Sequence, residues 1–126
     1  MLEACVRSGD ARSGLVVADR ALASMGPDHL WEAEIRRLRA EFLAALGASA
    51  DEAEAELDRA LIVARRQGAR MLELRIAATI LRHRLRNGDR PGACSIRDLL
   101  MSLIQELPEA RDSDEVRDAA TLIAQS

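Results

Sequence analysis

The chain has 126 residues, of which 48% are hydrophobic and 31% are charged, and its formal net charge is −3. This balance predicts one soluble globular domain, and it excludes a disordered chain and a protein that binds nucleic acid through overall positive charge. Only 2% of the residues are aromatic, so the core has to be built from Ala and Leu, which favours close-packed helices over a β-sandwich. We therefore expect an all-α fold.

Neither a membrane span nor a secretion signal is predicted. No apolar run approaches the ~20 residues that cross a bilayer, and the first four residues do not start a signal peptide. Cys5 and Cys94 are too few for a disulfide scaffold. The cytoplasm, where thiols stay reduced, is the expected location.

Six helices are predicted in chain order, with the three prolines at points where the helical pattern stops and restarts. Apolar residues recur at the spacing of one helix face, as Ile35, Leu38 and Phe42 do in the second helix. The predicted helices cover residues 11–25, 29–46, 50–67, 70–86, 91–106 and 113–124.

Several helix ends carry recognisable terminal residues. Gly47, Gly68 and Gly88 come just after predicted helices, where a left-handed backbone favours a residue without Cβ. Asp51 and Ser113 are the predicted N-caps, because their short side chains can accept hydrogen bonds from the first amides of a helix.

The chain also repeats itself with a period of about forty residues, which is typical of helical hairpins stacked into a solenoid. Gly14, Ala53 and Ala93 occupy one equivalent position, where a small residue lets antiparallel helices approach closely. The segment 53–75 is then the second helix of one hairpin, a glycine corner and the first helix of the next. The residues with predicted structural roles in the repeat are Trp31, Ala40, Gly47, Ala53, Leu57, Ala60, Gly68, Leu81, Gly88 and Ala93.

Trp31 is the only tryptophan in the chain. We predict that it is a buried anchor between hairpins, in which case Trp31→Ala would lower stability by roughly 3–5 kcal/mol. The alternative is an exposed residue at the centre of a binding surface.

Two runs of sequence resemble one bacterial family. Residues 31–43, WEAEIRRLRAEFL, resemble its WxAELxRLxGELLL run, and residues 53–75, AEAELDRALIVARRQGARMLELR, resemble its AEAxxxxxRALxxARRQGAxxLELR run. Both are typical of the tetratricopeptide-like C-terminal region of large proteins related to adenylate/guanylate cyclases. The resemblance covers roughly residues 15–90, and Ala40 stands where the family has a small Gly.

The resemblance implies an antiparallel array of helical hairpins that forms a superhelix of the tetratricopeptide (TPR) type. We expect a single domain over residues 1–126, with residues 107–126 as a C-terminal capping helix. The first hairpin is expected to be incomplete, because residues 1–9 are too short for its first helix. In the family, a cyclase or DNA-binding domain and an ATPase module precede the repeats. The chain is thus expected to be the C-terminal piece of a longer signalling protein, or a shortened descendant.

No catalytic residue, cofactor or metal ion is predicted. His29, His83 and the two cysteines show neither the spacing of metal ligands nor a nucleophile motif. The chain has no lysine, which excludes chemistry based on that residue. The acidic residues between Asp51 and Asp58 lack the pattern of a calcium loop and are predicted to form a solvated face.

The leading function is a non-catalytic protein-interaction or regulatory module that binds on the concave face of the superhelix. The second and fourth helices would line that face, and the candidate partner-binding residues there are Arg36, Arg39, Arg75 and Arg82. Many arginines are expected to form pairs within helices, such as Arg37 with Glu41. Docking on an acidic partner and binding of nucleic acid are the alternatives, the second disfavoured by the lack of aromatic residues and the negative net charge.

Two other classes of function stay open. If the first hairpin of the array lacks one helix, its remaining helix would expose an apolar face. The chain could then be a self-associating structural module or homodimer. The chain could also sense a small molecule or nucleotide on behalf of an ATPase module. The expected partner is a protein, either a domain of the same parent chain or a separate molecule, and no membrane is expected.

Overall fold

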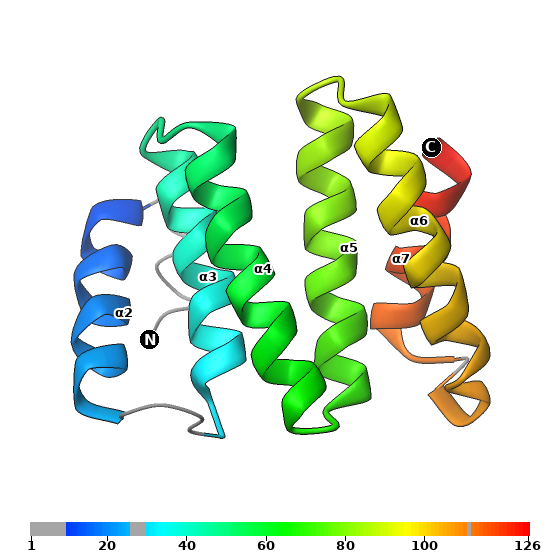
Figure 1. Cartoon of the computed structure of the whole chain (residues 1–126), viewed down its shortest axis with the longest axis horizontal. Coiled ribbons are helices and arrows are strands. Elements are labelled where there is room, and N and C mark those ends of the chain that lie inside the picture. Colours follow the sequence, from blue (N-terminus) through cyan, green and yellow to red (C-terminus); the bar gives the residue numbers. More distant parts are fainter. Residues whose placement is uncertain (1–9, 26–29, 111) are drawn as a thin grey trace. The chain divides into compact units, whose positions relative to one another are not determined.

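The computed structural model describes residues 10–25, 30–110 and 112–126. Within these residues the chain forms α-helices, one short 3-10 helix and no strand, which confirms the all-α prediction (Figure 1). The elements are α2 (Ala11–Met25), α3 (Glu32–Ala45), α4 (Ala50–Arg66), α5 (Arg70–Arg86), α6 (Arg90–Gln105), η1 (Pro108–Ala110) and α7 (Asp114–Gln125).

The predicted helix boundaries agree closely with the observed ones. Helices α2 and α5 begin and end as predicted, and α4, α6 and α7 differ by a single residue at one or both ends. The exception is α3, which begins at Glu32 rather than near residue 29, a residue that lies outside the described part of the chain. Trp31 therefore precedes the helix instead of lying in its first turn.

The chain divides into two compact units, Met1–Gln67 and Gly68–Ser126. In unit 1, helix α3 packs against both α2 and α4, and in unit 2, helix α5 packs against α6 and α7. Most packing is between helices that follow each other along the chain, and within each unit Figure 1 shows these neighbours running in opposite directions. The division falls at Gly68, the residue predicted to form the corner between two hairpins.

Several of the small residues with predicted structural roles are buried. Among the positions with predicted structural roles, those buried in unit 1 are Ala40, Ala53, Leu57 and Ala60, and those buried in unit 2 are Leu81 and Ala93. Because Ala carries no side chain beyond Cβ, two helix backbones come close together, and leucines fill the remaining space. Leu74 and Leu100 supply that volume in unit 2, where both are fully buried.

The helix ends follow the predicted chemistry with one correction. Gly47, Gly68 and Gly88 have φ values of 85°, 66° and 74°, in the left-handed region that glycine enters without strain. The hydroxyl of Ser113 accepts a hydrogen bond from the Val116 amide, which confirms that N-cap.

The prediction that Asp51 caps α4 is wrong. Ser49 is the N-cap, and its hydroxyl accepts from the Glu52 amide at 3.2 Å. Asp51 lies in the first turn instead, where its negative charge favours the helix dipole.

In unit 1, α2 and α3 come close together at Gly14. Ala11, Gly14 and Ala18 are the buried residues of α2, and the buried ring of Phe42 from α3 lies over Gly14. A Cβ atom added at Gly14 would lie 2.5 Å from the Phe42 ring, so no larger side chain fits without movement of that ring. Leu15 and Leu38 complete the cluster.

We predict that Gly14→Ala destabilises the protein by about 1 kcal/mol. Alanine gains about 1 kcal/mol in helix propensity over glycine, but overpacking against a buried ring costs about 1–3 kcal/mol. The measurement is urea unfolding followed by circular dichroism, with Ser13→Ala on the exposed side of α2 as the control. In a Phe42→Leu background the ring is gone, so there Gly14→Ala should become neutral or stabilising. A stabilising effect in the wild-type background would contradict the close contact.

Candidate interaction surface

The four arginines predicted to bind a partner fall into two pairs. Arg36 and Arg39 lie on α3 in unit 1, whereas Arg75 and Arg82 lie on α5 in unit 2. The two pairs therefore belong to different units. Their role in partner binding stays a prediction, but the contacts made by Arg36, Arg39 and Arg75 define what those side chains already do inside the fold.

Arg36 and Arg39 converge on one buried carboxylate, that of Glu56 on α4. Arg36 Nη1 donates to Glu56 Oε1 at 2.7 Å, and Arg39 Nη1 donates to Glu56 Oε2 at 3.0 Å. The Glu56 side chain is only 3% exposed, so each of its oxygens is held by a guanidinium in a setting with little water. The prediction of a solvated acidic face is wrong at this position.

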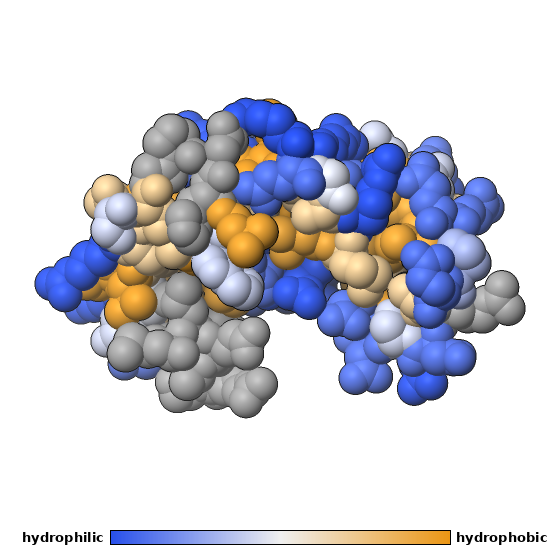
Figure 2. All heavy atoms as spheres, turned by 90° about the horizontal axis from the view of Figure 1, so that it is seen from below, coloured by the Kyte–Doolittle hydropathy of each residue, from blue (hydrophilic) through white to orange (hydrophobic). Residues whose placement is uncertain are grey.

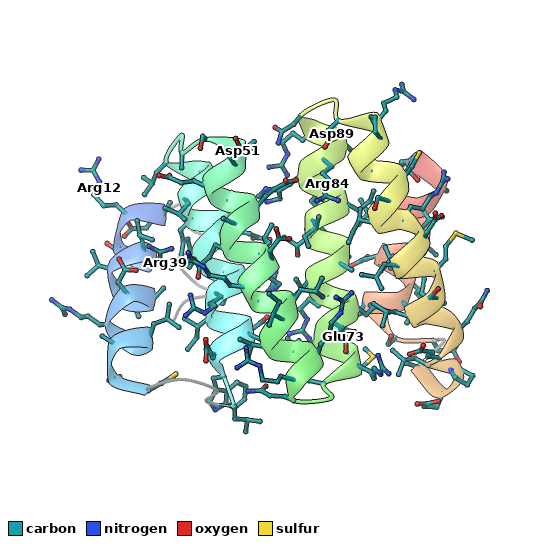
Figure 3. The ribbon with its side chains drawn as sticks, in the orientation of Figure 1. Arg12, Arg39, Asp51, Glu73, Arg84 and Asp89 are labelled. Atoms are coloured by element: carbon teal, nitrogen blue, oxygen red, sulfur yellow. The ribbon has the colours of Figure 1, made fainter. Side chains whose placement is uncertain are left out.

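The same two arginines also contact further acids. Arg36 Nε donates to Glu32 at 2.8 Å within α3, and Arg39 Nε donates to Asp19 of α2 at 2.7 Å. Arg39 thus links α2, α3 and α4, the helices described in unit 1, and Figure 3 shows its side chain on the α2 side of α3. Burial works against the charge of Arg36, but the hydrogen bonds to Glu32 and Glu56 outweigh it and raise the pKa of this guanidinium.

Pairs within helices account for other charges, as predicted. Arg37 bonds Glu34 at 2.8 Å and Glu41 at 3.3 Å, which confirms the predicted pair with Glu41. In unit 2, Arg75 Nη2 donates to Glu115 Oε1 at 3.1 Å and so ties α5 to α7. These contacts neutralise charge inside each unit.

The corner between α5 and α6 borders a hollow of about 360 Å³. Its charged lining includes Arg84 and Asp89, which lie near each other at this corner in Figure 3. Arg84 Nη1 donates to the Gly92 carbonyl at 2.9 Å, and the Asp89 carboxylate accepts from the Gly92 amide at 3.0 Å. Both side chains therefore hold the first turn of α6, which is a structural task.

Trp31 is 59% exposed, so the prediction of a buried anchor is wrong. The preceding residue, Leu30, is 71% exposed, and these two are the most exposed large apolar side chains in the described residues. Figure 2 looks onto the end of the molecule at which α3 begins, and apolar side chains form part of its surface. The cause is the late start of α3 at Glu32, which leaves Trp31 outside the stripe that buries Ile35, Leu38 and Phe42.

The contacts of Glu56 also indicate which residues of α4 lie at the level of Trp31 along the hairpin. Since α3 and α4 run in opposite directions, moving five residues from Arg36 back to Trp31 corresponds to moving five residues from Glu56 forward to Leu61, the neighbour of Ile62. Ile62 is 52% exposed. Leu30, Trp31 and Ile62 are therefore exposed apolar residues at the same end of the α3–α4 hairpin.

In the described part of the chain, the histidine and cysteine side chains that could bind a metal or act as a nucleophile lie on different helices. His83 is buried in α5, and Cys94 is an exposed free thiol on α6, while His29 and Cys5 lie outside the described residues. In the part of the chain that the structure describes, no group of three or more His, Cys, Asp and Glu side chains could hold a metal ion. None of the helices described is long and apolar enough to cross a membrane.

No protein-family model, no curated protein and no solved structure matches this chain. What the chain does has therefore to be inferred from its own side chains.

We predict that Glu56→Gln destabilises unit 1 by about 1–3 kcal/mol, because the arginines lose a charged acceptor at a buried position. In this variant Arg36 keeps its contact with Glu32, and Arg39 keeps its contact with Asp19. The expected loss of stability is therefore smaller than that for breaking a fully buried ion pair. The matched control is Asp51→Asn, an exposed acid on the same helix, with an expected loss of about 0.5 kcal/mol or less. Equal losses for the two variants in urea unfolding would show that the Glu56 cluster contributes no net stability.

Arg75 should control the titration of Glu115. The carboxylate accepts a hydrogen bond from its own backbone amide and another from Arg75, and both lower its pKa below the ordinary value. A lowered pKa means that this group stabilises the fold above the ordinary pKa and loses that contribution as pH falls through the depressed value. We predict that Arg75→Gln raises the pKa of Glu115 toward the ordinary value, as measured by NMR of the side-chain carboxyl carbon.

The control for this titration is Arg117→Gln, which removes the same charge two positions along α7 on a different side of the helix. It should leave the pKa of Glu115 nearly unchanged. If Arg117→Gln shifts the titration as much as Arg75→Gln does, net charge rather than the Arg75 contact sets the pKa.

Proposed function

We propose that this chain is a non-catalytic protein-interaction module built from helical hairpins of the tetratricopeptide type. The single observation that carries the proposal is the exposure of Leu30 and Trp31 side by side at the start of α3. We further propose that the chain acts as the C-terminal repeat region of a bacterial signalling protein related to adenylate/guanylate cyclases, on the strength of the two sequence runs described above.

Exposed Leu30 and Trp31 favour contact with a protein for an energetic reason. Tryptophan has the largest apolar surface of any side chain, and leaving it in water forfeits burial worth about 25 cal/mol per Å². A partner that covers this surface recovers that free energy, and tryptophan is enriched among the residues that dominate protein–protein binding. Ile62 is a third exposed apolar residue at the same end of the α3–α4 hairpin.

The packing of each unit supports the hairpin part of the proposal. Sequential helices lie together, left-handed glycines turn the corners, and small residues occupy the contact positions expected of a repeat. Such arrays present rows of exposed side chains on rigid helices, which suits recognition of a folded or helical partner.

The experiment places a photo-reactive benzoyl-phenylalanine at position 31 of the full chain in the source cells. The expected result is a cross-linked species containing a second, different protein. The matched control carries the same group at Arg12, an exposed residue of α2 whose side chain points away from the helices in Figure 3. A cross-link to a second copy would instead show self-association, and no cross-link specific to position 31 would count against the proposal.

Trp31→Ala should abolish capture of that partner while leaving the fold intact. Because the side chain is mostly exposed, we predict a change in unfolding free energy of less than about 1 kcal/mol. The measurements are partner capture and urea unfolding of the same variant. A loss of several kcal/mol would show that Trp31 acts in the fold rather than in recognition.

A further inference from the structure

We propose that the partner presents an acidic amphipathic helix, and that this helix docks along the exposed side of α4. This inference rests on the proposed function and adds the chemistry of the partner. The docking surface, called the α4 stripe below, consists of Ala55, Arg59, Ile62 and Arg66, all four of them exposed.

The α4 stripe is continuous because of its spacing. Its members follow each other at intervals of four, three and four residues, which keeps them on one side of a helix with 3.6 residues per turn. On the opposite side of α4, residues that include Ala53, Leu57 and Ala60 are buried in the core. The stripe therefore runs along a helix that the core holds in place.

A hollow borders the stripe on the side of α3. Its volume is about 220 Å³, and its lining includes Arg39 and Leu43 from α3 as well as Ala55 and Arg59 from α4. Glu52 and Glu56 of α4 complete the lining, and Arg36 and Arg39 already hold the Glu56 carboxylate. A partner side chain entering this hollow would therefore meet a partly buried leucine, two guanidinium groups and the exposed Glu52. Grooves between two packed helices are a common seat for an amphipathic helix.

Charge is distributed unevenly along α4. All five acids of the helix lie between Asp51 and Asp58, and the three charged residues from Arg59 onward are arginines. Arginines in the last turn favour the helix dipole, and this effect accounts for the position of Arg65 and Arg66. Arg59 lies two turns earlier, so the dipole does not account for it.

The contacts of Arg59 leave most of its guanidinium for solvent or a partner. Its nearest acid is Glu56 at 3.5 Å, and that carboxylate is already held by Arg36 and Arg39 at shorter distances. The Arg59 side chain is 66% exposed. A carboxylate arriving from solvent can therefore form a two-pronged pair with Arg59 without displacing an internal contact.

A complementary partner follows from these side chains. It needs apolar residues at helical spacing to cover Ile62 and the adjacent hollow, and carboxylates on the flanks to reach Arg59 and Arg66. Trp31 lies at the same end of the hairpin as Ile62, so the end of such a helix would reach the surface proposed above. A phosphate backbone would satisfy the arginines but would leave Ile62 uncovered.

The test uses a designed helical peptide of about 15 residues with leucines on one face and glutamates on both flanks. A second peptide has the same leucines, with lysine in place of every glutamate. Binding to the full chain is measured by fluorescence anisotropy at about 150 mM salt. The expected result is binding of the acidic peptide at least about tenfold tighter than binding of the lysine peptide.

Two double variants locate the binding site. Arg59→Gln with Arg66→Gln should weaken binding of the acidic peptide at least about tenfold. Arg12→Gln with Arg20→Gln removes the same charge from exposed positions on α2 and should change binding less than about twofold. Ile62→Ser should also weaken binding, with Val16→Ser on α2 as its control. Unchanged circular dichroism of each variant establishes that the fold is intact.

Several results would overturn the inference. These are equal binding of the two peptides, no binding of the acidic peptide up to about 1 mM, or equal effects of the two double variants. Binding of a single-stranded oligonucleotide that depends on Arg59 and Arg66, without binding of the acidic peptide, would replace the helix with nucleic acid. The cross-linking at position 31 is independent of these measurements. A partner captured there without acidic-peptide binding would overturn this inference alone, leaving the proposed function in place.

Discussion

The register of the α3–α4 hairpin depends on one buried carboxylate. A charged group removed from water costs several kcal/mol unless it is paired, and the two shortest contacts of Glu56 form only when Arg36 and Arg39 lie opposite it. A shift of α3 along α4 by one residue would rotate these arginines away and leave that buried charge with only the longer contact to Arg59. Contacts between alanines tolerate such a shift far better, because their surfaces are nearly uniform. The ion cluster therefore specifies the alignment that apolar packing alone leaves open, and that alignment brings Trp31 level with Ile62.

The need for this cluster follows from the composition. With one phenylalanine, one tryptophan and no tyrosine, the interior consists mainly of alanine, leucine and isoleucine. Each alanine contributes little buried area, so apolar burial is spread thinly over many positions. The fold compensates through close helix approach, as where the Phe42 ring lies over Gly14 in unit 1. Polar contacts then supply what alanines lack, which is directional preference: Arg39 joins three helices, and Arg75 joins α5 to α7.

Most of the helices and their ends could be predicted from the sequence, because the chemistry that decides them is local. Gly47, Gly68 and Gly88 act through their own backbone, and Ser113 caps the helix that it precedes. The failures involve contacts or backbone details that residue type alone does not reveal. Trp31 continues the apolar spacing of Ile35 and Leu38, but the helix starts one residue too late to include it. Glu56 stands among solvated acids in the sequence, and only the neighbouring helix supplies the arginines that pair with it when it is buried.

Ser49 and Asp51 are both good caps by residue type, so the choice between them depends on the exact backbone of the turn.

The arginines of α3 and α4 divide according to what already neutralises them. Arg36 and Arg39 each bond two acids at 3.0 Å or less, so a partner that recruited either one would have to break an internal contact. Arg59 makes only the longer contact with Glu56. Its exposed guanidinium can therefore donate hydrogen bonds to a new carboxylate at no such cost. Because Arg36 and Arg39 hold both oxygens of Glu56 at shorter distances, Arg59 keeps only a longer contact with that acid and stays exposed. The buried acid thus aligns the hairpin, and Arg59 supplies the charge through which its outer side would recognise a partner.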